Sequence, residues 1–170
     1  MPSPAPRRSD AAKLTITKGT ARDVPIIARM IRGLAEYEKL LHTVRMTPAT
    51  LRRHGFGRRR YFQTLICRRA GRPIGFALYF FTYSTFRAQP RLYLEDLFVL
   101  PDERGIGAGN ALLGALARIA VRRGCGGMEW TVLDWNAPSI RFYKGLGATL
   151  HPEWVLTRLE DDSLRKVARR

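Results

Sequence analysis

Residues 91–110, RLYLEDLFVLPDERGIGAGN, contain the pattern that decides the fold of this chain. An apolar strand runs into a short polar turn, and a glycine-rich stretch then opens an amphipathic helix. Three of its residues, Arg104, Gly107 and Gly109, have the spacing R-x-x-G-x-G. Glycine lets a backbone approach a ligand closely, and the free N–H groups at a helix start attract anions, phosphates above all. The stretch therefore predicts a strand–turn–helix unit that binds a phosphate-bearing ligand.

The two best-known phosphate loops do not fit this spacing. A P-loop requires a lysine directly after its last glycine, and no lysine follows these glycines. A dinucleotide-binding fingerprint that began at Gly105 would require another glycine at position 110, which is Asn110. The alternative is a tight strand-to-helix turn without a ligand, and three glycines in five residues after an arginine argue against it.

The hydrophobic patterns on both sides of this stretch predict alternating strands and helices. A short helix is expected after Asn136–Ser139 and a basic one after Asp162, and Asp23 is expected to cap the first helix. Strands are expected at residues 14–17, 61–68, 73–83, 91–99, 128–133 and 154–160, longer helices at 24–40 and 108–123, and a further short helix at about 48–54.

Strand 91–99 is apolar on both faces, which is typical of a central strand that is covered on both sides. Simple alternation puts Leu92, Leu94 and Phe98 on one face and Tyr93, Leu97 and Val99 on the other. Together with the antiparallel hairpins, this predicts an α/β (α+β) fold, in which a mixed, mostly antiparallel central sheet carries helices on both faces.

Length and composition indicate a folded domain rather than a disordered chain. With 170 residues, of which 45% are hydrophobic, we expect one domain over residues 14–170 and a disordered tail at 1–13. The N-terminus lacks the apolar core of a secretory signal, and the longest apolar run, 74–81, is far too short to span a bilayer. A soluble cytoplasmic protein without membrane contact is therefore expected.

The charge of the chain is unusual, because 30 Lys and Arg residues oppose 14 Asp and Glu residues and give a formal net charge of +16. Such a charge permits binding to nucleic acid, for which Arg52–Arg60, with five arginines in nine residues, would be the surface. No nucleic-acid motif accompanies it, so an arginine-rich solvated surface is favoured. No metal site is expected, because the cysteines and histidines are scattered: Cys67, Cys125, His42, His54 and His151.

The stretch LYLEDLFVLPDERGIGAG resembles the acetyl-CoA-binding core of the GNAT N-acetyltransferase superfamily, whose signature is [Q/R]-x-x-G-x-[G/A]. The chain is most similar to the diamine (spermidine/spermine) N-acetyltransferase branch, and the similarity runs in order over roughly residues 14–160. The segments that carry it are LAEYE (34–38), HGFG (54–57), GFALYFFTY (75–83), LYLEDLFV (92–99) and WNAPSIRFYKGLGA (135–148).

This resemblance implies a GNAT fold, acetyl-CoA as the acetyl donor and a defined set of cofactor contacts. The backbone of the strand end would pair with the pantetheine arm, and the glycine loop would receive the pyrophosphate. The implied cofactor residues are Leu97, Phe98, Val99, Arg104, Gly105, Ile106, Gly107, Ala108, Gly109, Asn110, Asn136, Ala137, Pro138, Ser139 and Tyr143.

Two residues are expected to act in acetyl transfer. By resemblance, Tyr143 is the acid that protonates the departing CoA thiolate, and a phenol is protonated at neutral pH. Glu95 faces the acceptor amine and takes its proton directly or through water, while Asp96 is a supporting group. The alternatives from the residues alone are a packed tyrosine at 143 and an ion pair between Glu95 and one of the many arginines.

The acceptor side departs from the polyamine-acetylating branch. Ser84 stands where that branch has an aspartate, Phe86 replaces a tryptophan, and the stretch before HGFG, LLHTVRMTPATLRR, has no carboxylate. Since a polycation needs several carboxylates, a small amino acid or thialysine-like amine fits better. The residues that match the substrate side of the family are Tyr37, Glu38, Glu95, Glu129 and Glu153.

The sequence thus predicts an N-acetyltransferase that acts on the primary amine of a small molecule, and the resemblance implies a homodimer. Two alternatives stay open. Within the same fold, the acceptor would be a protein lysine or a protein N-terminus. In a different class, the chain would be a basic nucleic-acid-binding module that uses Arg52–Arg60.

Overall fold

The computed structural model describes residues 13–170, which form two compact units, one up to Thr131 and the other Val132–Arg170. The expected tail lies outside the described residues except for Lys13. The strands of the first unit are β1 (Leu14–Lys18), β2 (Gln63–Arg69), β3 (Arg72–Ser84), β4 (Gln89–Val99) and β5 (Met128–Glu129). Its helices are α1 (Val24–Tyr37), α2 (Pro48–Leu51) and α3 (Ala108–Arg122), with short helical turns at Ala21–Asp23, Leu41–Thr43, Arg52–Phe56 and Pro101–Glu103.

The five strands form one sheet in the order β1-β2-β3-β4-β5. The first four strands pair antiparallel, and β5 pairs parallel with β4 after the chain has crossed over through α3. This confirms the mixed, mostly antiparallel sheet expected from the sequence. The strand expected at 128–133 is shorter than predicted, because only Met128 and Glu129 pair with β4.

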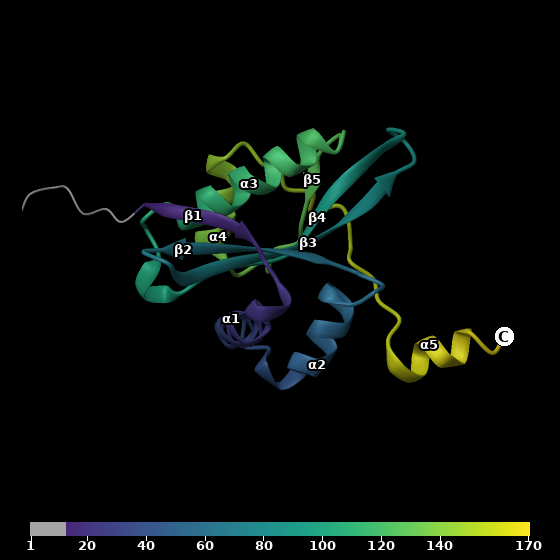
Figure 1. Cartoon of the computed structure of the whole chain (residues 1–170). Coiled ribbons are helices and arrows are strands. Elements are labelled where there is room, and N and C mark those ends of the chain that lie inside the picture. Colours follow the sequence, from purple (N-terminus) through teal and green to yellow (C-terminus); the bar gives the residue numbers. More distant parts are fainter. Residues whose placement is uncertain (1–12) are drawn as a thin grey trace, which may run out of the picture. The chain divides into compact units, whose positions relative to one another are not determined.

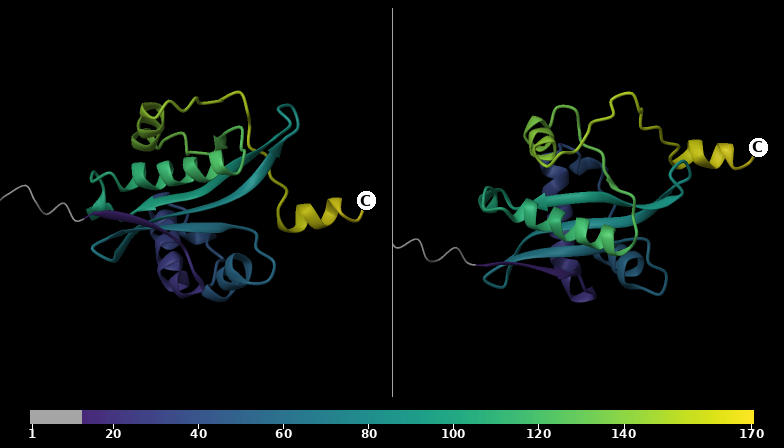
Figure 2. Two further views of the ribbon diagram at one scale, coloured as in Figure 1. Left: turned by 45° about the horizontal axis from the view of Figure 1, so that its top comes forward. Right: turned by 90° about the horizontal axis from the view of Figure 1, so that it is seen from above.

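Helices cover both faces of this sheet, as Figures 1 and 2 show for α1 and α2 on one face and α3 on the other. The apolar side of α1 packs on the sheet in a buried cluster, where burial of each large side chain contributes about 1.5–3 kcal/mol. On the opposite face, α3 buries its apolar side against β1–β4. The α1-side cluster comprises Val24, Ile27, Ala28, Met30, Leu51, Ile66, Phe76, Leu78 and Phe98.

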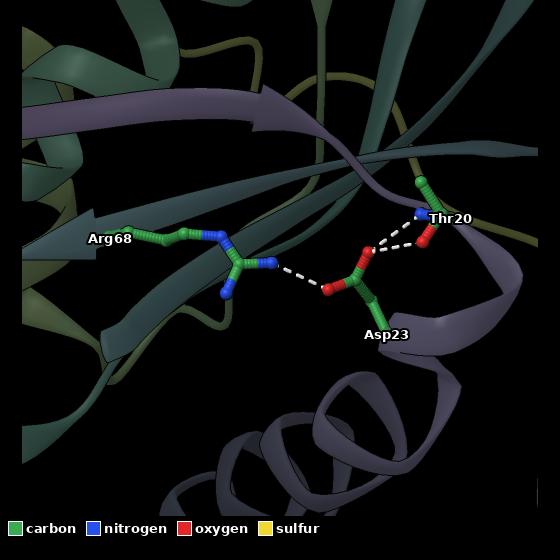
Figure 3. A network of polar contacts seen from close by, with 3 residues as sticks. All are labelled: Thr20, Asp23 and Arg68. Carbon is green, nitrogen blue, oxygen red and sulfur yellow. Dashed lines mark hydrogen bonds and ion pairs between the residues drawn. The ribbon is translucent and has the colours of Figure 1, made fainter. Parts of the chain in front are cut away.

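Asp23 precedes α1 as expected, but its carboxylate does not cap that helix with a side-chain hydrogen bond. Instead it accepts from the backbone N–H and the hydroxyl of Thr20, at 2.8 Å each, and from the Arg68 guanidinium of β2 at 2.5 Å (Figure 3). Burial alone would raise the pKa of Asp23, yet the hydrogen bonds from Thr20 and Arg68 outweigh it and lower the pKa. The network therefore ties the start of α1 to the sheet.

A β-bulge in β4 corrects the face assignment that simple alternation predicted. Leu94 pairs with Tyr79 and Asp96 pairs with Leu78, so Glu95 is an extra residue without a partner on β3. Because the extra residue reverses the alternation, Phe98 lies on the α1 side, opposite to Leu94. The α3 side of β4 carries Leu92, Leu94, Leu97 and Val99, and the α1 side carries Tyr93, Asp96 and Phe98.

The second unit contains α4 (Ala137–Gly145) and α5 (Asp161–Val167), which confirms two short helices near the C-terminus. The expected cap at Asp162 is displaced, since Glu160 is the residue before α5. The strand predicted at 154–160 is wrong: these residues are exposed and pair with no strand among residues 13–170. An apolar alternation becomes a strand only where another strand offers its backbone, and none is described there.

Candidate active site

The bulge of β4 presents Glu95 at the surface. Its side chain is exposed, and no basic side chain in residues 13–170 forms an ion pair with it. The alternative of an arginine ion pair is therefore not found in the part of the chain that the structure describes. A bulge re-aims a side chain away from the regular pleat, which is why bulges are common beside active sites.

Asp96, the next residue, lies in an acidic group that sequence reasoning treated as support only. Burial, reinforced by the nearby carboxylates of Glu95 and Glu38, raises the pKa of Asp96 to about 7. Burial also raises the pKa of Glu38, which follows the last turn of α1. The structure thus brings Glu38 and Glu95, two predicted substrate residues, together around Asp96. Such a group attracts an ammonium ion and can accept a proton near neutral pH.

The end of β4 has one edge without a strand partner. Leu97, Phe98 and Val99 pair with β3 on one side. On the other side, the pairing with β5 covers only Leu92 and Tyr93 and then stops. Among residues 13–170, no further strand continues that edge. A chain with amide groups, such as a pantetheine arm, can bind to an edge of this kind by backbone hydrogen bonds.

The glycine loop has the geometry that its spacing predicts. Gly105 and Gly107 have φ angles of +80° and +88°, which L-residues with a side chain rarely adopt. Gly107 is the N-cap residue of α3, but it has no side chain that could accept a hydrogen bond from the first N–H groups of the helix. A Cβ at either position would meet no heavy atom within 4 Å. The loop therefore leaves space beside a helix start, where an anion is stabilised.

Glu103 holds the start of this loop in place, a role that the sequence did not reveal. Its carboxylate is buried and forms ion pairs with Arg69, at 2.9 Å, and with Arg72. Both arginines lie at the turn between β2 and β3, so the ion pairs fix the 3₁₀ turn Pro101–Glu103 to the sheet. Both partners lie more than 30 residues away in the sequence, so no local pattern indicated this role.

Arg104 extends toward the end of α1. Its guanidinium lies 4.8 Å from the ring centre of Tyr37 and 5.8 Å from that of Phe98. Its Nε donates a hydrogen bond to the Val99 carbonyl at 3.1 Å. The predicted substrate residue Tyr37 and the predicted cofactor residues Phe98 and Val99 are therefore held together by one arginine side chain.

Glu129 is engaged within the sheet. It forms an ion pair with Arg91 at 3.2 Å, and its other oxygen accepts a hydrogen bond from the Thr82 hydroxyl at 3.1 Å. The structure therefore gives this predicted substrate residue a bracing role between β3, β4 and β5.

The remaining predicted residues belong to the second unit and are described by themselves. Asn136 is buried and caps α4, since its side chain accepts from the Ser139 N–H at 3.3 Å. Tyr143 is half-buried on α4, with its ring 5.4 Å from that of Phe142. Glu153 contacts His151 at 2.9 Å, and this hydrogen bond lowers the pKa of Glu153.

The described residues offer neither a metal centre nor a membrane span. Within residues 13–170, no three His, Cys, Asp or Glu side chains gather as a metal ion requires. In the same range, no helix has the length and apolar character to cross a membrane.

The first unit fits an acetyl-CoA molecule in its chemistry. The glycine loop and the start of α3 suit the pyrophosphate, and the unpaired edge of β4 suits the amide-bearing arm. The carboxylates of Glu38, Glu95 and Asp96 lie at the bulge of the same strand, where an amine would be attracted. The arrangement can therefore hold a thioester donor and draw a cationic acceptor to it.

Comparisons with known proteins identify the family of this chain. The model of the acetyltransferase (GNAT) family matches residues 30–148. Thialysine N-epsilon-acetyltransferase of Mus musculus is 36% identical over 170 residues, which cover 94% of this chain and 99% of the relative. Spermidine/spermine N(1)-acetyltransferase-like protein 1 of Homo sapiens is 34% identical over 172 residues, covering 95% of this chain and 25% of the relative.

Among solved structures, an integron cassette protein from the mobile metagenome of V. cholerae has a TM-score of 0.76 and 25% identity, covering 92% of this chain and 98% of that one. The expected GNAT fold and the resemblance to the diamine branch are thus confirmed. With the family matched over more than half of its length, this chain belongs to the GNAT family and is an N-acetyltransferase whose acetyl donor is acetyl-CoA.

Proposed function

We propose that this enzyme transfers the acetyl group of acetyl-CoA directly to the primary amine of a small molecule. The observation that carries the proposal is the bulge of β4, which exposes Glu95 beside the half-buried carboxyl of Asp96 on the strand whose edge is open. The amine is held as an ammonium ion by these carboxylates and by Glu38. Its proton passes to Glu95, directly or through water, and the free amine attacks the thioester carbonyl.

The second half of the proposed reaction concerns the leaving group. When the carbon–sulfur bond breaks, its electron pair stays on sulfur and forms the CoA thiolate. We propose that Tyr143 donates its phenolic proton to that thiolate, and solvent then returns a proton to the tyrosinate. A backbone N–H of Leu97 or Phe98 polarises the thioester carbonyl, because an amide dipole stabilises the oxyanion as it forms.

We propose that the acceptor is a small amine of the thialysine or amino-acid type rather than a polyamine. Thialysine N-epsilon-acetyltransferase is similar to this chain over nearly the whole length of both proteins. The hairpin after β3 supports this choice, since exposed Phe86 and half-buried Ser84 offer no charge to a polycation. The segment before HGFG, residues 40–53, also lacks a carboxylate.

Replacement of Tyr143 by Phe tests the proton donor. The variant keeps the ring that lies against Phe142 but loses the hydroxyl, so we expect kcat to fall by about 100-fold or more. The KM for acetyl-CoA should change little, because binding of the donor does not use that proton. Steady-state release of free CoA, measured with a lysine-type acceptor, gives both values.

Tyr83→Phe is the matched control, since Tyr83 is exposed on β3 and should retain wild-type turnover. A Tyr143→Phe enzyme with kcat within twofold of the wild type would remove Tyr143 from the mechanism. Absence of acetyl transfer to any small amine by the wild type would instead contradict the proposed function itself.

We further propose that the enzyme is a homodimer and that residues 154–156 lie in its interface. In the described chain these residues, Trp154, Val155 and Leu156, are 76%, 80% and 58% exposed. Three consecutive exposed apolar side chains are unusual in a monomer and are typical of a contact surface.

A further inference from the structure

A cleft of about 340 Å³ lies in the segment that joins α2 to β2. None of its lining residues takes part in the proposed reaction. This volume is at the lower end of the range for small-molecule sites. The residues that line the cleft, called the arginine cleft below, are Arg53, His54, Gly57, Arg58, Arg59 and Tyr61.

The backbone around the arginine cleft is closely packed. Residues 52–56 form a π-helical turn, a rare conformation that is frequent at functional sites. A Cβ at Gly55 would lie 2.5 Å from the Phe62 ring, and a Cβ at Gly57 would lie 2.5 Å from the Arg53 carbonyl oxygen. Glycine is therefore required at both positions. The Tyr61 N–H closes the turn by donating to the His54 carbonyl at 2.8 Å.

The arginine cleft carries positive charge without an acidic partner. No carboxylate lines it, and no ion pair joins Arg53, Arg58 or Arg59 to a carboxylate of residues 13–170. Arg59 lies over the Tyr61 ring at 5.6 Å, and the Nε of Arg53 donates to His54 at 3.3 Å. Guanidinium groups that have no protein carboxylate are suited to bind a carboxylate or phosphate of a ligand.

The arginine cleft lies on the same side of the sheet as the acidic group at Asp96. Phe56 and Phe62, which flank it, pack on the α1-side cluster that contains Phe98. Gln63, two residues after Tyr61, pairs with Tyr79, and Tyr79 pairs with Leu94, the residue before Glu95. Gln63 and Leu94 are therefore two strand spacings apart, or about 10 Å. An extended small amino acid, together with the reach of arginine and glutamate side chains, covers such a distance.

We infer that the arginine cleft binds the carboxylate of the acceptor, an inference that rests on the proposed function. The acceptor is then an amino acid with a distal amine: its ammonium end is held by Glu95 and Asp96, and its carboxylate is held by Arg58 and Arg59. Opposite charges at the two ends of the site fix the direction in which the substrate enters. A polyamine has a cation at each end, so one end would face the arginines and be repelled.

Matched pairs of acceptors test this assignment. Lysine and ornithine each have a decarboxylated counterpart, cadaverine and putrescine, with the same distal amine and no carboxylate. For the double variant Arg58→Gln and Arg59→Gln, we expect the KM for lysine and ornithine to rise about tenfold or more. The KM for the two diamines should not rise, and kcat should stay near the wild-type value.

The matched control is Arg52→Gln and Arg60→Gln, which removes the same charge from the same segment but from residues that do not line the cleft. It should leave the KM of all four acceptors unchanged. Lysinamide lacks the carboxylate, so its KM with the wild-type enzyme should be higher than that of lysine. In the cleft variant the KM for lysinamide should not rise further. Circular dichroism and thermal melting verify that both variants are folded.

An equal rise in KM for amino acids and diamines, or the same effect in the control, would overturn the inference and leave the proposed function standing. The inference would also be overturned if the cleft variant kept the wild-type KM for all four acceptors but lost binding to single-stranded RNA. The cleft would then be a nucleic-acid-binding surface. Failure of the wild type to acetylate any of the four acceptors would contradict the inference and the proposed function together.

Discussion

Asp96 is the residue whose chemistry differs most from its ordinary behaviour in water. With a pKa of about 7, its carboxyl is partly protonated at neutral pH, although a free aspartate would be fully ionised. The cause is burial on the α1 side of β4, followed by the negative charges of Glu95 and Glu38. The fold therefore tolerates an ionised Asp96 only at a cost in stability.

This cost has a definite dependence on pH. The pKa of Asp96 is higher in the folded than in the unfolded protein, so its contribution to stability is full below about pH 4 and is lost as pH rises through about 7. Asp96→Asn keeps the shape but cannot ionise. We expect the variant to be more stable than the wild type at pH 8, by on the order of 4 kcal/mol, and to match it near pH 4.

Urea unfolding of both proteins between pH 4 and pH 8 measures this difference. Asp102→Asn, on an exposed turn, is the control and should follow the wild type at every pH. A stability difference between Asp96→Asn and the wild type that stays constant with pH would show that the carboxyl of Asp96 titrates normally.

At the level of residues, the resemblance implied that Glu95, Glu38 and Tyr37 lie on the substrate side, and that role stays a prediction. The sequence alone did not show which carboxyl of β4, that of Glu95 or that of Asp96, is the exposed one. Which of Glu95 and Asp96 is exposed depends on the bulge, and the bulge depends on pairing with β3. The raised pKa of Asp96 also depends on Glu38, which is far away in the sequence. Long-range proximity of this kind has no local signal.

Among the elements, the turn from β4 into α3 was the most predictable. Glycines, a polar turn and an apolar helix stripe all favour the same local structure, and local agreement makes an element recognisable. The strand at 154–160 failed because its alternation has no partner strand among residues 13–170. The bulge at Glu95 was missed because nothing in the sequence marks the extra residue.

Gly107→Ala tests the loop as an element. The added methyl group meets no protein atom, so only the φ of +88° makes the change unfavourable, by about 1–2 kcal/mol. The added methyl group also lies beside the start of α3, where the pyrophosphate would bind. We expect the KM for acetyl-CoA to rise severalfold while kcat changes little, as measured in steady-state kinetics.

The control lies in the same helix. A Cβ at Gly114 would make an ordinary contact of 3.5 Å with Arg118, so Gly114→Ala should stabilise the protein by about 0.5–1 kcal/mol. Its KM for acetyl-CoA should equal that of the wild type. If Gly107→Ala also kept a wild-type KM, the loop would have no part in binding the donor.

For the whole molecule, the proposed dimer is the property with the clearest test. The double change Trp154→Ser and Leu156→Ser removes two exposed apolar side chains from residues 154–156. Because their burial between two copies would stabilise the dimer, we expect the mass measured by light scattering to fall from two chains to one. Leu164→Ser, which alters an exposed apolar residue of α5, should leave the mass unchanged.

A dimer that persists in the double variant would place the interface elsewhere, and a wild-type monomer would contradict the homodimer.

The net charge of +16 follows directly from the sequence, but the partners of the individual arginines do not. Only the structure shows which arginines are bound to carboxylates, such as Arg69 and Arg72, and which gather around a cleft.

The open edge of β4 has a further consequence, for solubility. A bare strand edge is a template on which other chains aggregate, and proteins protect such edges with bulges and charged side chains. Here the bulge and the carboxylate of Glu95 stand at the start of the unpaired stretch. The same local irregularity that presents Glu95 to an acceptor therefore also guards the enzyme against aggregation whenever acetyl-CoA is scarce.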